Sequence, residues 1–124
     1  TIVIFPEGAL SPREGGFCEP RTGAARLALA SGAPVIPVGI HLQMARARSI
    51  ISMVEGQPEE GRWYLNGPYH VTVGRPISFR GNVENHEYVR TVSKAIMSHI
   101  KEMAYQSRER MQQGPTRLRV PELY

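Results

Sequence analysis

The order of apolar and polar segments over the first forty residues limits the possible folds more than any other feature of the sequence. Residues 1–5 form a short apolar run that predicts a buried strand, and residues 6–20 hold the Pro, Gly and charged residues of a loop. Thr22 to Ala30 predicts a helix with Thr22 at its N-cap. Val35 to Ile40 is a second apolar segment and predicts a second strand. This order predicts a βαβ unit with a right-handed crossover and a parallel sheet.

The rest of the chain adds one strand and one long helix. Gln43 to Val54 has a mixed pattern, and Glu55 to Pro68 reads as a polar loop. The alternating segment Tyr69 to Val73 predicts a strand. A helix is expected to begin at Asn82 or Asn85 and to run to about Met111, because apolar residues recur every three or four positions. These are Val89, Val92, Ile96, Ile100 and Met103. We therefore predict an α/β fold with a mostly parallel sheet flanked by helices, over residues 1–112, and a flexible tail over 113–124.

The charge balance allows several kinds of partner. The 124 residues carry 15 Lys and Arg against 11 acidic residues, for a net charge of +4. This excess favours phosphorylated ligands or anionic lipid surfaces, or it is a solvated basic surface. No aromatic interleaving or groove-reading motif is present, so we expect no nucleic-acid partner. The single cysteine, Cys18, argues against a disulfide framework, and no apolar run approaches the ~20 residues of a membrane span. We also predict no metal site.

A carboxylate follows the first predicted strand within the sequence Phe5-Pro6-Glu7-Gly8. Ligands of open α/β sheets bind beyond the carboxyl ends of the strands, and Glu7 is placed there. Pro6 fixes its own φ and Gly8 permits a tight turn, so the Glu7 side chain would be held firmly. A carboxylate held in this way can accept hydrogen bonds from hydroxyls or orient a cation. The alternative is an exposed acid in an ordinary turn.

Three spaced blocks resemble those of the glycerolipid acyltransferases, of the 1-acyl-sn-glycerol-3-phosphate acyltransferase type. They are Phe5-Pro6-Glu7-Gly8-Ala9-Leu10-Ser11, the basic-x-Gly helix start at Arg21-Thr22-Gly23, and Val35-Ile36-Pro37-Val38. The resemblance is clear over residues 2–40, looser at Gly74-Arg75-Pro76-Ile77, and absent from the long helix. It implies the C-terminal portion of a glycerol-3-phosphate acyltransferase-like fold, with the N-terminal part missing.

The resemblance also implies an activity. The family transfers an acyl group from acyl-CoA or acyl carrier protein to a hydroxyl of lysophosphatidic acid or a related lipid in phospholipid biosynthesis, without a further cofactor. The implied location is the cytoplasmic face of the membrane, with attachment that is peripheral or made through the missing N-terminal part. A His in a His-x-x-x-x-Asp motif serves the family as the general base. This chain contains no Asp, so that motif is absent and no catalytic residue is assigned. We expect a cut N-terminus, or alternatively a degenerate homologue that binds lipid or acyl carrier protein without turnover.

The resemblance assigns substrate-binding roles to a set of residues. These are Phe5, Pro6, Glu7, Gly8, Ser11, Arg13, Arg21 and Pro37. Glu7 is expected to contact the glycerol of the acceptor or to shape its pocket. Leu10 stands where the family has an Arg that contacts the substrate phosphate. Arg13 is a candidate replacement; otherwise the acceptor lacks a phosphate there or is a different lipid.

The remaining candidates each have an ordinary structural alternative. Arg21 and the helix start that follows it could bind an anion, or Arg21 is a surface cation. Pro37 shapes the second predicted strand beside an acyl or acceptor pocket, or is purely structural. His41 either faces the site or is a structural histidine. Arg46 and Arg48 either contact membrane headgroups or lie on a solvated face.

Overall fold

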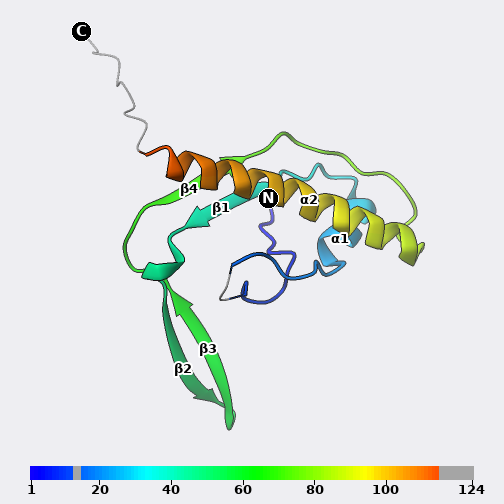
Figure 1. The fold of residues 1–124 in the computed structure, drawn as a ribbon. Coiled ribbons are helices and arrows are strands. Elements are labelled where there is room, and N and C mark those ends of the chain that lie inside the picture. The colour runs from blue at the N-terminus through cyan, green and yellow to red at the C-terminus, as the bar shows by residue number, and fades with distance from the viewer. Residues whose placement is uncertain (13–14, 115–124) are drawn as a thin grey trace.

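A computed structural model describes residues 1–12 and 15–114 of the protein (Figure 1). It confirms the α/β class. The elements, in chain order, are α1 (Gly23–Ser31), β1 (Val38–Leu42), the 3₁₀ helix η1 (Met44–Arg46), β2 (Arg48–Val54), β3 (Gln57–Trp63), β4 (Tyr69–Val73) and α2 (His86–Gln112).

The strands form two separate pairs, and the predicted parallel sheet is not supported. β1 pairs antiparallel with β4, from Val38 opposite Val73 to Leu42 opposite Tyr69, and β2 pairs antiparallel with β3. The predicted strand over residues 1–5 does not form, because no neighbouring strand among the described residues pairs with it. The predicted strand Val35 to Ile40 begins later, at Val38, and Val35 makes only an isolated bridge with Ile77.

The core lies between α2 and the two elements that it covers, α1 and the β1–β4 pair (Figure 1). Val89, Val92 and Ile96 are buried, and Ile100 packs against them, which confirms much of the predicted helical stripe. Ala25 of α1 joins this cluster. The long helix begins where Asn85 caps it, because the Asn85 side chain accepts a hydrogen bond from the Tyr88 amide at 3.1 Å. Neither helix in the described part of the chain is long and apolar enough to cross a membrane.

The β1–β4 pair has two unlike faces. Gly39 and Thr72 are directly opposite each other on the face that α2 covers, and both are buried. A Cβ at Gly39 would collide with the backbone of Met103 and Ala104, so this glycine permits the close approach of α2. Ser107 of α2 hydrogen-bonds the Thr72 hydroxyl at 2.6 Å and donates to the Gly39 carbonyl at 3.1 Å.

Apolar side chains on the opposite face of this pair stay exposed. They are Val38, Ile40, Val71 and Val73, each at least 40% exposed. Ile2, Val3 and Phe5 at the N-terminus are at least 70% exposed. A monomeric globular protein rarely leaves this much apolar surface uncovered.

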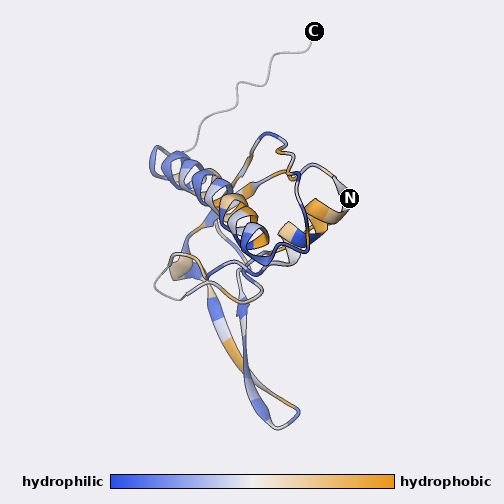
Figure 2. Ribbon diagram, turned by 90° about the vertical axis from the view of Figure 1, so that its right-hand side faces the viewer, coloured by the Kyte–Doolittle hydropathy of each residue, from blue (hydrophilic) through white to orange (hydrophobic). Residues whose placement is uncertain are grey.

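The β2–β3 hairpin was missed by the sequence pattern, which predicts a loop over Glu55 to Pro68. Its two-residue turn is Glu55-Gly56, with φ of 50° and 78°, and such positive values match the twist of a hairpin. Pro58, which disfavours a strand, is tolerated because β3 is an edge strand. The hairpin projects away from the rest of the molecule (Figures 1 and 2), and every residue of β2 is exposed.

Candidate functional site

The Phe5-Pro6-Glu7-Gly8 segment forms a hydrogen-bonded turn. The Gly8 amide donates to the Phe5 carbonyl at 3.2 Å, and Gly8 has φ of 62°, a value that favours glycine. Pro6 and Glu7 are half-buried, whereas Phe5 is exposed. The turn that the sequence predicts is therefore present, although the strand predicted before it is not.

Glu7 is held by the loop that follows the turn. Its Oε2 accepts a hydrogen bond from the Cys18 amide at 2.6 Å. Cys18 Sγ lies 3.5 Å from the Leu10 carbonyl and is oriented to donate to it. The Glu7 carboxylate thus joins the two ends of the segment that runs from Glu7 to Cys18. Oε1 of Glu7 has no hydrogen bond within the described residues.

Arg21 lies against the same turn. Its amide donates to the Pro6 carbonyl at 2.8 Å, and its carbonyl accepts from the Ser93 hydroxyl of α2 at 3.3 Å. A Cβ at Gly8 would lie 2.8 Å from Arg21 Cδ, so the Arg21 side chain crosses directly over Gly8. Thr22 occupies the N-cap position of α1, but its side chain makes no capping hydrogen bond. The structure thus brings together Pro6, Gly8 and Arg21, which the sequence analysis grouped from the family blocks.

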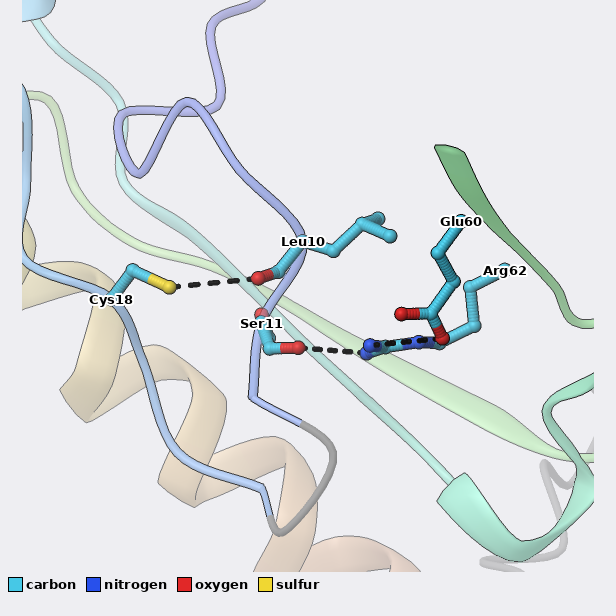
Figure 3. A network of polar contacts seen from close by, with 5 residues as sticks. All are labelled: Leu10, Ser11, Cys18, Glu60 and Arg62. Atoms are coloured by element: carbon cyan, nitrogen blue, oxygen red, sulfur yellow. Dashed lines mark hydrogen bonds and ion pairs between the residues drawn. The ribbon is translucent and has the colours of Figure 1, made fainter. Parts of the chain in front are cut away.

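A residue that the sequence analysis did not select reaches the loop from the hairpin (Figure 3). Arg62 Nη1 donates to the Ser11 carbonyl at 2.7 Å, and Arg62 Nη2 lies 3.8 Å from Glu60 Oε1. The Arg62 side chain is only 13% exposed. The loop prediction for residues 55–68 hid this contact, because it gave no reason to place Arg62 near Ser11. Arg13, the predicted replacement for the missing motif Arg, lies outside the described residues.

Pro37 lies in a different place. It is buried and lines a pocket of about 370 Å³ with Arg75, Ile77, His99 and Met103. The Gly74 amide donates to the Pro37 carbonyl at 2.8 Å, which joins the Pro37 segment to the Gly74-Arg75-Pro76-Ile77 turn. A second pocket, of about 330 Å³, is lined by Glu19, Pro20, Lys94 and Lys101. The predicted substrate-binding residues therefore divide between the Glu7 turn and the Pro37 pocket.

The remaining candidates lie away from the turn. His41 pairs with His70 across β1 and β4. Burial, followed by the charges of Arg108 and His70, lowers the pKa of His41 below its ordinary 6.5. Arg46 donates to the Gln43 side chain at 2.9 Å, and Arg48 is exposed at the base of the hairpin. Within residues 1–12 and 15–114, no three His, Cys, Asp or Glu side chains are grouped so that they could hold a metal ion.

The arrangement around Glu7 can recognise a polar group, but the described residues that contact this turn include no histidine that could serve as a general base. The exposed Arg21 side chain supplies cationic donors and the Glu7 carboxylate supplies acceptors, both held by backbone contacts. The base that an alcohol needs to become a nucleophile would come from residues other than these.

Comparison with known proteins agrees with the first part of the sequence analysis. Residues 1–41 match the family model described as Acyltransferase. No curated protein and no solved structure matches the chain. The matched region contains the Glu7 turn, Arg21 and Pro37, and it ends within β1. The resemblance to acyltransferases is therefore confirmed over these 41 residues.

Proposed function

We propose, from the acyltransferase match of residues 1–41, that this protein takes part in transfer of an acyl group from acyl-CoA or acyl carrier protein to a hydroxyl of lysophosphatidic acid or a related lipid. The match carries the proposal because it includes both the Glu7 turn and the Val35-Ile36-Pro37-Val38 block. The acyl donor is a co-substrate, and the proposal needs no further cofactor. The pathway would be phospholipid biosynthesis.

The Glu7 turn is proposed as the acceptor side of the site. Its carboxylate is anchored through Oε2 by the Cys18 amide, so Oε1 is the oxygen left to accept a hydrogen bond from a glycerol hydroxyl. Arg21 lies over Gly8 and would add positive charge near a phosphorylated headgroup. Pro37 lines a separate pocket in which apolar side chains predominate, and that pocket would suit part of an acyl chain.

The general base is proposed to lie in a segment outside this chain. The sequence contains no Asp, so a His-x-x-x-x-Asp base cannot be assembled from it. The exposed apolar residues Ile2 and Val3, and the uncovered face of the β1–β4 pair, are surfaces that such a segment would bury. The same segment would provide attachment to the cytoplasmic face of the membrane, unless the protein binds the membrane surface peripherally.

The second candidate function is a non-catalytic homologue that binds lipid or acyl carrier protein. The absence of Asp is the observation that favours it, because it leaves the chain without the His-x-x-x-x-Asp motif whose His serves the family as the base. This candidate shares the Glu7 turn with the first and differs from it in one respect only, the existence of a base elsewhere in the protein.

The test is to read the coding sequence upstream of Thr1 and then to assay the encoded protein with radiolabelled acyl donors and lysophosphatidic acid. We expect an in-frame His-x-x-x-x-Asp motif and acyl transfer that is lost when its His is replaced. Lipid binding without transfer, in a protein that lacks the upstream motif, would instead support the non-catalytic homologue.

A further inference from the structure

One edge of the Arg62 guanidinium, formed by Nε and Nη2, is only partly satisfied by the described residues. Arg62 Nε is buried and has no hydrogen-bond partner among the described residues. Arg62 Nη1 donates to the Ser11 carbonyl, and Arg62 Nη2 forms an ion pair with Glu60 Oε1 at 3.8 Å, which is longer than a hydrogen bond. Nε and Nη2 point their N–H bonds outward from the same edge of the planar group. Buried N–H donors in native proteins almost always have a hydrogen-bond acceptor, so the Nε donor of this edge is expected to have one in the functional protein.

The shape of this edge defines the kind of partner. Two parallel N–H donors on one edge of a guanidinium match two oxygens of a single oxyanion, and arginine binds phosphate and carboxylate in this two-bond manner. A lone carbonyl or hydroxyl would satisfy only one of the two donors. An oxyanion is therefore the chemical class that fits.

The position of the edge links it to the Glu7 turn. Ser11 follows Glu7 by four residues, and the Leu10 carbonyl beside it is contacted by Cys18, whose amide holds Glu7. Figure 3 shows the Arg62 guanidinium reaching the loop at Ser11, with Glu60 next to it. Leu10, which is half-exposed in this loop, has an apolar side chain and cannot bind an anion.

We propose that Arg62 binds the phosphate group of the acceptor through its Nε–Nη2 edge, at the site of the Glu7 turn. This inference rests on the proposed function, which supplies a phosphorylated acceptor. The β2–β3 hairpin is then a substrate-binding element that carries its cationic residue to the loop. Glu60, whose carboxylate lies nearest Nη2, competes with the phosphate by charge.

The first experiment measures binding of glycerol 3-phosphate to the 124-residue chain by isothermal titration calorimetry. Arg62→Lys keeps the charge but removes the two-donor edge, so we expect its affinity to fall about tenfold. The matched control is Arg48→Lys on the same hairpin. The Arg48 side chain is exposed and makes no hydrogen bond or ion pair among the described residues, so we expect a change within about twofold. Equal losses in both variants, or none in Arg62→Lys, would overturn the proposal.

Two further variants distinguish phosphate binding by Arg62 from a purely structural role of this residue. Glu60→Gln removes the competing charge and should tighten binding, a gain that a folding defect cannot produce. Arg13→Ala tests the alternative cation in the same loop. If Arg13→Ala loses the binding and Arg62→Lys keeps it, Arg62 is not the phosphate-binding residue.

The source of the phosphate is distinguished by comparing inorganic phosphate, glycerol 3-phosphate and lysophosphatidic acid in detergent micelles. Arg62-dependent binding that is tightest for the lysophosphatidic acid supports the acceptor site. Equal binding of all three would assign the edge to free phosphate and overturn the link to the acceptor.

The failure of this inference can be told apart from the failure of the proposed function. Acyl transfer with an acceptor KM that Arg62→Lys leaves unchanged would reject Arg62 and keep the function. Arg62-dependent binding of lysophosphatidic acid without acyl transfer would keep Arg62 and reject the function as an enzyme.

Discussion

The two halves of this molecule are held together by different means. α2, α1 and the β1–β4 pair enclose the core, with Val92 and Ile96 buried. Residues 1–12 and 15–21 and the β2–β3 hairpin are mostly exposed and joined by polar contacts, such as Glu7 to Cys18 and Arg62 to Ser11. We call these the packed half and the loop–hairpin half. The Phe5-Pro6-Glu7-Gly8 turn and Arg21 fall in the loop–hairpin half, so these residues, which we propose bind a ligand, lie where few apolar contacts fix them.

The strongest test of this difference compares one strand glycine from each half. Gly39→Val places a side chain against the backbone of Met103 and Ala104, so we expect a loss of about 4 kcal/mol or more despite the high strand propensity of Val. At Gly61 an added Cβ would lie 3.4 Å from Trp63 Nε1 and 3.8 Å from the Ile50 carbonyl, which are tolerable distances.

Gly61→Val should therefore change the free energy of unfolding by less than about 1 kcal/mol. Urea unfolding followed by circular dichroism measures both variants. A Gly39→Val protein as stable as the parent chain would show that α2 is not packed against β1 as described.

The second test compares isoleucines. Ile96 is 3% exposed and Ile51 is 67% exposed. Ile96→Ala removes buried methyl groups and leaves a cavity, so we expect a loss of about 3 kcal/mol. Ile51→Ala should cost less than about 0.5 kcal/mol, because its side chain has little contact to lose. The same unfolding measurement applies, and a large loss at Ile51 would mean that the hairpin is covered in solution, by another copy or by another segment.

The third test compares two serines, and its expected effect on the free energy of unfolding is smaller. Ser107 is fully buried and bonds both the Thr72 hydroxyl and the Gly39 carbonyl. Ser107→Ala leaves these groups short of a partner and should cost about 1.5 kcal/mol. Ser52 of β2 is exposed, and Ser52→Ala should be neutral within about 0.5 kcal/mol. Hydrogen exchange of the β4 amides offers a second readout, since it should rise in Ser107→Ala only.

The packed half was the more predictable of the two. The spacing of Val89, Val92 and Ile96 predicted one face of a helix, and Asn85 was one of two residues proposed for its start. The alternation over Tyr69 to Val73 predicted β4 with the bounds that the structure has. In each case the signal is local, because burial on one face of an element repeats with the period of that element.

The loop–hairpin half depended on information that local patterns do not contain. A strand needs a neighbour, and residues 1–5 have none among the described residues, so their apolar run was not sufficient. The hairpin was hidden by Pro58 and the two adjacent glutamates, although Glu55-Gly56 is a recognisable two-residue turn. The turn at Glu7 was predicted, but the contact of Arg62 with Ser11 spans 51 residues and leaves no local trace.

The smallest effect concerns the pH dependence of the packed half. Burial, Arg108 and His70 lower the pKa of His41 in the folded protein below the ordinary 6.5. As the pH falls through about 6.5, His41 becomes protonated in the unfolded chain but stays unprotonated in the folded chain. The free energy of unfolding therefore decreases. The contribution of His41 to stability is therefore fully present above about pH 6.5. It is lost progressively as the pH falls from there to the pKa that His41 has in the folded protein.

His41→Gln should reduce the loss of stability between about pH 7.5 and about pH 5.5. Arg108→Gln should reduce this loss by a smaller amount, because the substitution removes only the second cause of the lowered His41 pKa. Urea unfolding at the two pH values measures the difference. His70 faces His41 across the strand pair in all three proteins, so only the difference between variants reports on His41. An identical pH dependence in the parent chain and in His41→Gln would mean that His41 takes up its proton equally in the folded and unfolded states, and that α2 does not shield it.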